Sequence, residues 1–388
     1  MKHHGEVVSD LRRAEELATA WDELAVSASR PYCSPGWLLA WWRYAAPAHA
    51  ELRMIAGWEG SELIGIAPLF ASHARRRVRE FRFLGSGVST RVEPVARAGR
   101  EDAMASTIAA ALARARPGAA LVSFEGIPEG SLWPEWIQES WPGSSSPRLR
   151  RGRIAAAPTL YLKGQSYDNW FAGKSRNFRS QMRRALRTLS ESGATFKLAR
   201  TRSELDEGLR AFNELHHARW HERGGSGVLS LGVERMLVDA ARALSSGDRF
   251  QLWLIDLNGR PISAQIFISA GTELAYWGGG FDAAWAAQRP SLLGILAAIE
   301  HGHSLGFRSI SLGAGGAPYK YRFTSDEEKL QWISLVPRRR GQLAVHGALA
   351  LRQLRRRLRE SASQRVSLQR RSAITSYFSC LRSYRRRS

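Results

Sequence analysis

The sequence predicts an α/β (α+β) protein made of two similar halves in tandem. Each half is expected to hold a mixed, mostly antiparallel sheet flanked by helices, and a basic C-terminal tail follows. The main observation is a repeat: a hairpin, a third strand, a helix and a strand occur over residues 52–125 and again over residues 250–312. The second observation is composition, because 388 residues with 44% apolar content and 14 Trp can build two cores.

The second repeat carries the clearer pattern. Residues 250–256 alternate apolar and polar side chains, Asn258-Gly259 is a strong hairpin turn, and residues 261–270 return as the second strand. A third strand over 273–280, a loop at 288–293, a helix over 293–305 and a strand over 308–312 follow. Helices are also predicted over residues 175–192, 203–219 and 232–244.

The first half repeats this order after two helices. Those helices span residues 11–27 and the segment after Ser34-Pro35, which carries Trp37 and Trp41 as packing residues. Residues 126–157 are rich in Pro, Gly and Ser and are interpreted as a linker. The expected units are therefore an N-terminal domain 1–125, the linker 126–157, a C-terminal domain 158–337 and a tail 338–388.

Charge is concentrated in the tail. The chain has a net charge of +22, of which residues 338–388 supply +14 from 15 Arg and one Glu. A short basic amphipathic helix around Leu351, Leu354 and Leu358 suits an anionic membrane surface better than nucleic acid, with an unstructured basic extension as the alternative. No signal peptide or membrane-spanning run is recognised, and Cys33 and Cys380 form no disulfide framework. The expected location is the cytoplasm, with the tail able to hold the protein at the inner face of the membrane.

Four stretches resemble one known family. They are Trp21 with the Ser34-Pro35-Gly36-Trp37 segment, the basic run 174–184, the His216-to-Trp220 motif with Arg223-Gly224, and the segment from Gly280 through Tyr319-Lys320. In order and spacing they resemble the CelD-type, FemAB-related branch of the GNAT acyltransferase superfamily. That resemblance implies two tandem GNAT-like domains, with the N-terminal one non-catalytic. It also implies acetyl-CoA or another acyl-CoA as co-substrate.

The donor site is predicted at the start of the helix after the third strand. Free N–H groups at residues 291–294 and the Arg289 guanidinium could face a pyrophosphate. An ordinary helix start, with Pro290 in the first turn and Ser291 as a cap, is the alternative. The cofactor-binding candidates are Gln288, Arg289, Ser291, Leu292, Leu293 and Gly294.

Asp282, Tyr319 and Lys320 are the catalytic candidates. Asp282 follows three glycines that allow a ligand to approach the backbone, and it could orient the acceptor or act as a base. A turn or helix cap is the alternative for Asp282. Tyr319 could protonate the departing thiolate and Lys320 could pair with a phosphate, whereas packing and a solvated ammonium are the alternatives.

Acceptor-binding candidates are Arg183, Arg184, His217 and Trp220. The arginines could line a groove for an anionic sugar or phosphate, although a charged helix face is usually just solvated. His217 could act as a base or simply pack. No metal site is predicted, because no third ligand accompanies the histidines.

The predicted function is transfer of an acyl group from CoA to an amine or hydroxyl. The resemblance suggests a cell-envelope or exopolysaccharide-related acceptor. One alternative is a FemAB-like transferase that uses aminoacyl-tRNA as donor, which the basic helix over 175–192 fits. Another is a non-catalytic assembly or binding protein of polysaccharide biosynthesis, because Ser311 and Leu312 stand where the family carries an acidic residue.

Overall fold

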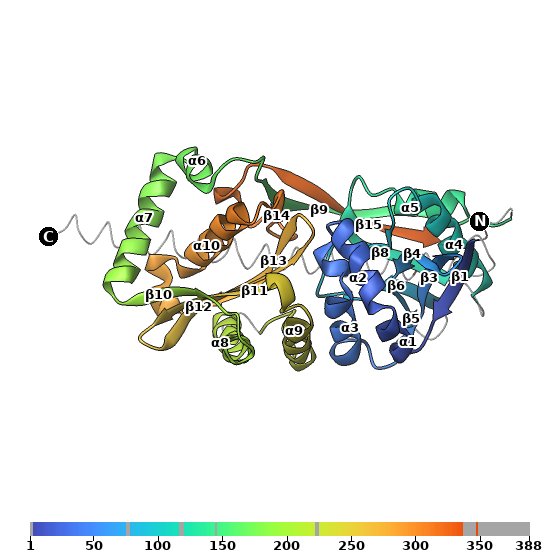
Figure 1. The fold of residues 1–388 in the computed structure, drawn as a ribbon, viewed down its shortest axis with the longest axis horizontal. Helices are drawn as coiled ribbons and strands as arrows, with labels where there is room; N and C mark the ends of the chain where they lie inside the picture. Colours follow the sequence, from blue (N-terminus) through green and yellow to red (C-terminus); the bar gives the residue numbers. More distant parts are fainter. Residues whose placement is uncertain are drawn as a thin grey trace.

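The computed structural model describes residues 3–74, 78–115, 120–143, 146–221 and 225–336, together with residue 347. The molecule is elongated, with the two halves side by side along its long axis (Figure 1). The N-terminal half lies at one end and the helix α7 (Arg176–Glu191) lies at the other. The basic tail, apart from residue 347, and the Arg223-Gly224 part of the third motif lie outside the described residues.

The N-terminal half combines helices with mostly short strands. In chain order its elements are β1 (His3–Val8), α1 (Leu11–Glu16), α2 (Ala18–Ser27), η1 (Pro31–Cys33), α3 (Pro35–Tyr44), β2 (Glu51–Leu52), β3 (Met54–Glu59), β4 (Glu62–Ala67), β5 (Leu69–Ala74), β6 (Val78–Phe83), β7 (Val95–Ala96), α4 (Glu101–Arg114) and β8 (Ala120–Pro128). The predicted hairpin is β3–β4, and the helix predicted later in the repeat over residues 52–125 is α4.

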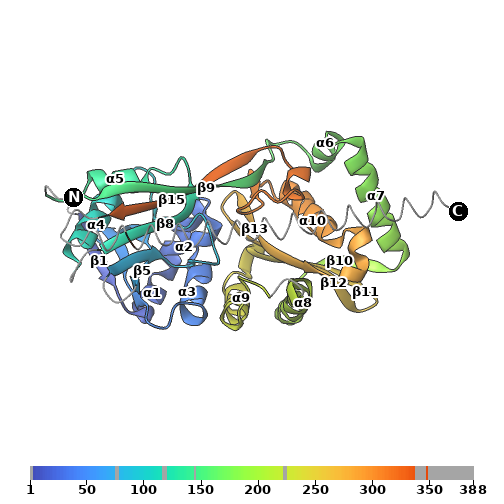
Figure 2. The same cartoon turned by 180° about the vertical axis from the view of Figure 1, so that it is seen from behind.

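The C-terminal half follows the predicted order closely. Its elements are α6 (Tyr167–Ala172), α7, β10 (Ala194–Leu198), α8 (Arg202–His221), α9 (Leu231–Ala243), η2 (Ser246–Asp248), β11 (Phe250–Leu257), β12 (Arg260–Ala270), β13 (Glu273–Phe281), η3 (Ala283–Gln288), α10 (Pro290–Ser304), β14 (Ser309–Ser311) and η4 (Lys320–Arg322). Asn258 and Gly259 both have positive φ, as the two-residue hairpin turn requires. The helix α10 packs on one face of the sheet and α8 and α9 lie on the other (Figures 1 and 2).

The internal repeat is visible in the strand pairing. Among the described strands, the parallel neighbours are β6–β8 and β13–β14, and each pair is connected through one helix, α4 or α10. All other described pairs are antiparallel. Each half thus contributes mostly antiparallel strands and one parallel crossover, as the fold class predicts. The N-terminal hairpin β3–β4 lies in a separate four-stranded sheet with the order β1-β3-β4-β7.

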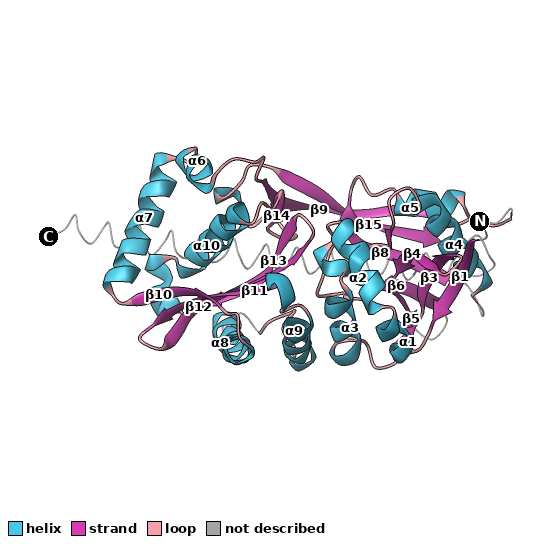
Figure 3. Cartoon of the chain, in the orientation of Figure 1, coloured by secondary structure: helices cyan, strands magenta, loops and turns pink. Residues whose placement is uncertain are grey.

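The segment predicted as an irregular linker is instead regular structure. Residues 126–157 contain the end of β8, the helix α5 (Trp133–Glu139) and most of the strand β9 (Arg148–Tyr161), as Figure 3 shows. Pro128 ends β8, and Pro134 stands in the first turn of α5, where its missing N–H costs nothing.

Two long strands join the halves into one eleven-stranded sheet. The strand β9 pairs with β14 through Thr159–Tyr161 and with β15 (Glu327–Val336) along most of its remaining length. β15 in turn pairs with β8. The last described strand of the predicted C-terminal domain therefore lies against the N-terminal half. Its backbone hydrogen bonds make the two halves one continuous structure.

Candidate functional site

The strands β13 and β14 separate soon after they meet. They pair only from Glu273 to Ala275, opposite Ser309 to Ser311, and β13 then continues to Phe281 without this neighbour. At the point of separation β13 also bulges, because Ile266 of β12 faces Gly278 whereas Phe267 faces Tyr276, which leaves Trp277 as the extra residue. The gap is closed on one side by the start of α10.

A cavity of about 270 Å³ lies at this gap. It is lined mainly by residues of α8, β13, η3, α10 and the segment after β14: Arg219, Tyr276, Phe281, Ala286, Arg289, Pro290, Ser291, Leu292, Ile295, Tyr319 and Arg322. We call it the α10 cavity. A polar mouth beside an apolar wall of Leu292 and Ile295 is a common composition for a small-molecule site.

Arg289 is held in a sparsely populated backbone conformation at the entrance. Its φ of 53° and ψ of 47° are left-handed, and it precedes Pro290, the first residue of α10. The Leu292 and Leu293 amides both donate to its carbonyl, which closes the first turn of the helix. The expected row of free amides at 291–294 is therefore wrong for these two residues.

Three arginines surround the α10 cavity, and none has a carboxylate within ion-pair distance among the described residues. The guanidinium of Arg219 lies over the Phe281 ring at 5.0 Å. Arg322 lies over a ring of α7 and donates to Gln181 Oε1 at 2.7 Å. Burial, and next the positive charge of Arg289, lower the pKa of Arg322. Uncompensated positive charge in a cavity favours an anionic ligand.

A buried hydrogen-bond chain runs from the cavity wall into the sheet. Tyr319 and Tyr276 share a hydrogen bond, and Tyr276 donates to Gln265 Oε1 at 2.9 Å. The Gln265 amide nitrogen donates to Ser291 Oγ at 3.1 Å and to Gly280 O at 3.2 Å. Burial raises the pKa of both tyrosines, so both hydroxyls carry their protons at neutral pH.

The predicted donor loop is only partly at the cavity. Arg289, Ser291 and Leu292 line it, whereas Gln288, Leu293 and Gly294 are not part of the lining. Leu293 is buried in the core. A Cβ on Gly294 would lie 2.9 Å from Gln265 Cγ, so this glycine allows α10 to pack against β12. Its role in the structure is packing.

The catalytic candidates are separated by the fold. Tyr319 lines the α10 cavity, but Asp282 and Lys320 do not. Asp282 caps η3 by accepting the Ala284 amide at 2.9 Å, which is the cap expected as its alternative. Lys320 is buried and donates to Gly313 O and Ala314 O, each at 2.9 Å. Burial lowers its pKa to about 8. Its ammonium therefore holds the glycine-rich loop.

The acceptor candidates do not converge on one place. Arg183 lies over the Phe171 ring of α6, and Arg184 is exposed on α7. His217 forms a surface pair with Glu234 of α9 at 2.7 Å. Trp220 lies beside His216, which is the histidine of the pair that faces β13.

Sequence reasoning missed Gln265, Tyr276, Arg219 and Arg322. A buried Gln within an otherwise apolar strand was the available signal for Gln265, and Arg219 lies inside the third motif. The described residues contain no cluster of three metal-ligating side chains and no helix long and apolar enough to cross a membrane.

Comparison with known proteins identifies the class. Residues 176–321 match the family described as acetyltransferase (GNAT) domain. All residues lining the cavity except Arg322 fall within this segment. The C-terminal half of the chain therefore contains a GNAT-type acyltransferase domain. No curated protein sequence matches it.

Solved structures extend the fold likeness over both halves. FemX has a TM-score of 0.61 at 11% identity, covering 87% of this chain and 97% of its own. The C-terminal domain of a putative lysylphosphatidylglycerol synthetase from Agrobacterium fabrum has a TM-score of 0.54 at 12% identity, covering 89% and 96%. L-PGS from Bacillus licheniformis has 0.51 at 11% identity, covering 89% and 97%. These likenesses, at 11–12% identity, show that the fold is shared over both halves of the chain.

Proposed function

We propose that the protein transfers an acyl group from acyl-CoA, with acetyl as the first choice, to an amine or hydroxyl. The observation that carries this proposal is the α10 cavity, where strand separation, a helix start and three arginines meet; none of the three has an ion-pair partner among the described residues. An anionic carrier can place its diphosphate near Arg289 and Arg322 while its thioester points along β13. The resemblance to the family points to a cell-envelope or exopolysaccharide-related acceptor.

Tyr319 is the proposed proton donor. In the reaction the acceptor nitrogen or oxygen attacks the thioester carbon, the carbon–sulfur bond breaks, and the thiolate takes the Tyr319 proton. The acceptor gives up its own proton to water, and the Tyr319 phenolate then regains a proton from water. Burial keeps this hydroxyl protonated until the thiolate forms, and the positive charge of Arg219 favours the phenolate that remains. Asp282 and Lys320 receive no chemical step in this mechanism, since their polar atoms are bonded to the protein backbone.

The test is calorimetry with the full chain and acetyl-CoA, longer acyl-CoAs and free CoA. We expect micromolar binding of at least one thioester and a loss of about tenfold or more in Arg289→Ala, the size of one lost charge-assisted hydrogen bond. Arg12→Ala is the matched control, because Arg12 is an exposed arginine of the N-terminal half. No binding by the wild-type protein, or equal losses in both variants, would refute an acyl-CoA donor.

A second donor is favoured by one observation on α7. The exposed arginines Arg176, Arg183, Arg184 and Arg187 have no ion-pair partner among the described residues, and Gln181 on the same helix bonds the cavity residue Arg322. This basic face fits the phosphates of an aminoacyl-tRNA, the donor that the FemAB resemblance implies. Salt-sensitive tRNA binding that is lost when these arginines become Gln, without acyl-CoA binding by the wild type, would select this donor.

A further inference from the structure

One loop of the N-terminal half reaches the strand that lines the α10 cavity. Residues 84–94, between β6 and β7, contact β13 at two points, Glu273 and Trp277. We call them the docking loop. Tyr276, which lines the cavity, lies between these two contacts in the sequence.

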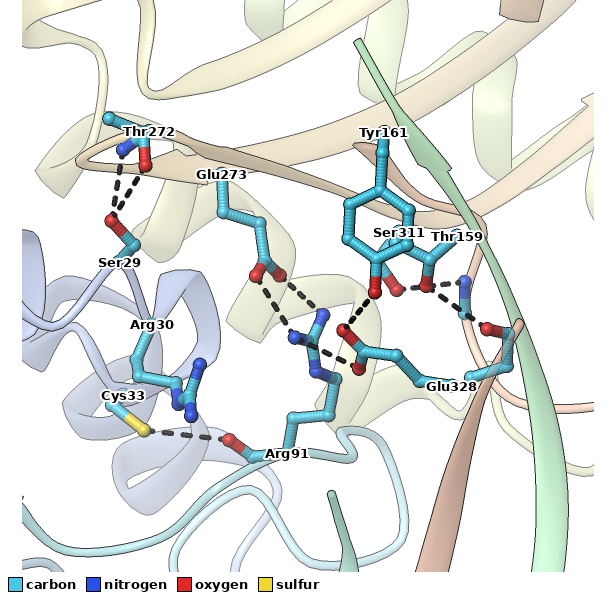
Figure 4. Close-up of polar contacts among 12 residues, drawn as sticks. Ser29, Arg30, Cys33, Arg91, Thr159, Tyr161, Thr272, Glu273, Ser311 and Glu328 are labelled. Carbon is cyan, nitrogen blue, oxygen red and sulfur yellow. Dashed lines mark hydrogen bonds and ion pairs between the residues drawn. The ribbon is translucent and has the colours of Figure 1, made fainter. Parts of the chain in front are cut away.

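The first contact is a buried ion pair. Arg91 donates to both carboxylate oxygens of Glu273, with Nη2 to Oε2 at 3.0 Å, and both residues are almost fully buried (Figure 4). The same guanidinium lies 3.3 Å from Glu328 of β15, which also accepts from Tyr161. Glu273 is the first residue of β13 and pairs with β14.

The backbone of Arg91 is itself held firmly. Its φ is 64°, in the left-handed region, its amide donates to Gly126 O at 2.7 Å, and its carbonyl accepts from the buried Cys33 thiol. A non-glycine residue stays in this conformation only where the surroundings impose it. The Arg91 guanidinium therefore has a fixed position relative to the Glu273 carboxylate.

The second contact holds the bulge. Trp277 is the extra residue of β13, and its indole Nε1 donates to Val88 O at 3.1 Å. Its ring meets the edge of Trp37 at 6.0 Å, and Trp37 in turn donates to Ser89 Oγ at 2.7 Å. The bulge thus has partners from the N-terminal half where the neighbouring strand β14 has already diverged.

We propose that the docking loop is a positioning element of the transfer site, with Arg91 and Trp277 as its positioning residues. The inference rests on the proposed function. A strand that has lost its neighbour keeps one edge without ladder hydrogen bonds, so its bulge needs another support. The docking loop supplies that support on both sides of Tyr276. The N-terminal half, expected to be non-catalytic, is in this view required for the geometry of the C-terminal site.

The chemistry of the contact favours positioning over simple adhesion. A buried ion pair gives little net stability compared with apolar residues of the same size, because both charges lose their hydration. The bidentate Arg91–Glu273 bonds and the Trp277 indole N–H bond do, however, fix the direction and distance of β13 relative to the docking loop.

The test compares Trp277→Phe with Trp58→Phe. Both remove an indole donor and keep a ring, but Trp58 donates to Glu6 far from β13. In the full chain we expect Trp277→Phe to speed amide exchange of residues 276–278 by about tenfold and to weaken acetyl-CoA binding by a similar factor, the size of one hydrogen bond. The melting temperature should shift equally in both variants.

Arg91→Lys, with Arg43→Lys as its control, tests the same claim if Trp277→Phe does not fold. Arg43 also bonds two carboxylates, but on the surface. Exchange at 276–278 and acetyl-CoA affinity that match the controls would overturn the positioning role. If the wild type binds no acetyl-CoA, the proposed donor fails, and the exchange measurement still decides whether the docking loop fixes the bulge.

Discussion

The three glycines at the end of β13 provide a graded test of the site. The sequence alone suggests that all three let a ligand approach the backbone. In the structure they differ: a Cβ on Gly278 would meet nothing within 4 Å, one on Gly279 would meet Gln265, and one on Gly280 would meet the backbone of α8. None of the three has a positive φ, so alanine is compatible with each backbone and only the surroundings differ.

The loss of stability is largest where the added Cβ meets atoms that cannot move away. At Gly279 the new Cβ would lie 1.9 Å from Gln265 Oε1, so the whole buried amide must move and break its bonds to Tyr276 and Ser291. Overpacking costs about 1–3 kcal/mol and a buried polar group left unpaired costs about 1–3 more. At Gly280 the Cβ would lie 2.8 Å from the His216 amide nitrogen, which cannot rotate away, and we expect a loss of about 2–3 kcal/mol.

Gly278→Ala is the internal control for stability and a probe for binding. With open space around it, alanine should stabilise the chain by roughly 0.4–1 kcal/mol by restricting the unfolded state. Gly278 does not line the α10 cavity, so the added methyl should leave acyl-CoA binding unchanged.

The assay is urea unfolding of the three variants together with acetyl-CoA calorimetry. The expected order of stability is Gly278→Ala at or above wild type, then Gly280→Ala, then Gly279→Ala. A Gly279→Ala protein within about 0.5 kcal/mol of wild type, the ordinary range for a neutral surface change, would refute the buried Gln265 chain.

Three further predictions concern other parts of the chain. Lys320 has a pKa of about 8 in the folded protein against the ordinary lysine value of 10.5, so the unfolded state binds more protons between pH 8 and pH 10.5. The free energy of unfolding should therefore rise with pH across this window, by an amount on the order of 3 kcal/mol. Urea unfolding at several pH values should show this rise in the wild type and not in Lys320→Met. Tyr319→Phe should keep acyl-CoA affinity but slow thiol release by about 10²–10⁴, and an unchanged rate would exclude it as the acid. Deleting residues 338–388 should abolish sedimentation with anionic liposomes without changing the melting temperature; salt-insensitive binding by the truncated protein would contradict a membrane role of the tail.

Periodicity and turn chemistry predicted most elements of the C-terminal half. The hairpin at Asn258-Gly259, the third strand and the helix after it are all present, because local signals alone decide them. Residues 126–157 were predicted as a linker because local signals do not decide their structure. Strand β9 begins with the polar run 148–153, whose pattern carries no apolar alternation, and it becomes a strand only because β15 returns to pair with it.

The site was harder to predict because its chemistry depends on long-range contacts. Tyr319 and Arg289 could be named from their positions in the sequence, and both line the α10 cavity. Lys320 was equally prominent in the sequence, but the fold turns its ammonium toward the Gly313 and Ala314 carbonyls. A Gln in a strand is only a weak signal for Gln265, because the two glycines on either side of it come from different elements, β13 and α10.

The arrangement of Gly279, Gln265 and Gly294 explains how the site can be both polar and rigid. A Cβ added at either glycine would lie within 3 Å of the Gln265 side chain. The lack of a side chain at these two positions, one on β13 and one on α10, therefore creates the space for the buried Gln265 amide. That amide then receives the Tyr276 hydroxyl and donates to Ser291 at the start of α10, which links the bulged strand to the helix. A fully bonded buried network of this kind allows few alternative arrangements. The same residues that hold β13 against α10 therefore also fix the hydroxyl that supports Tyr319, and a change at any of them should alter donor binding and proton transfer together.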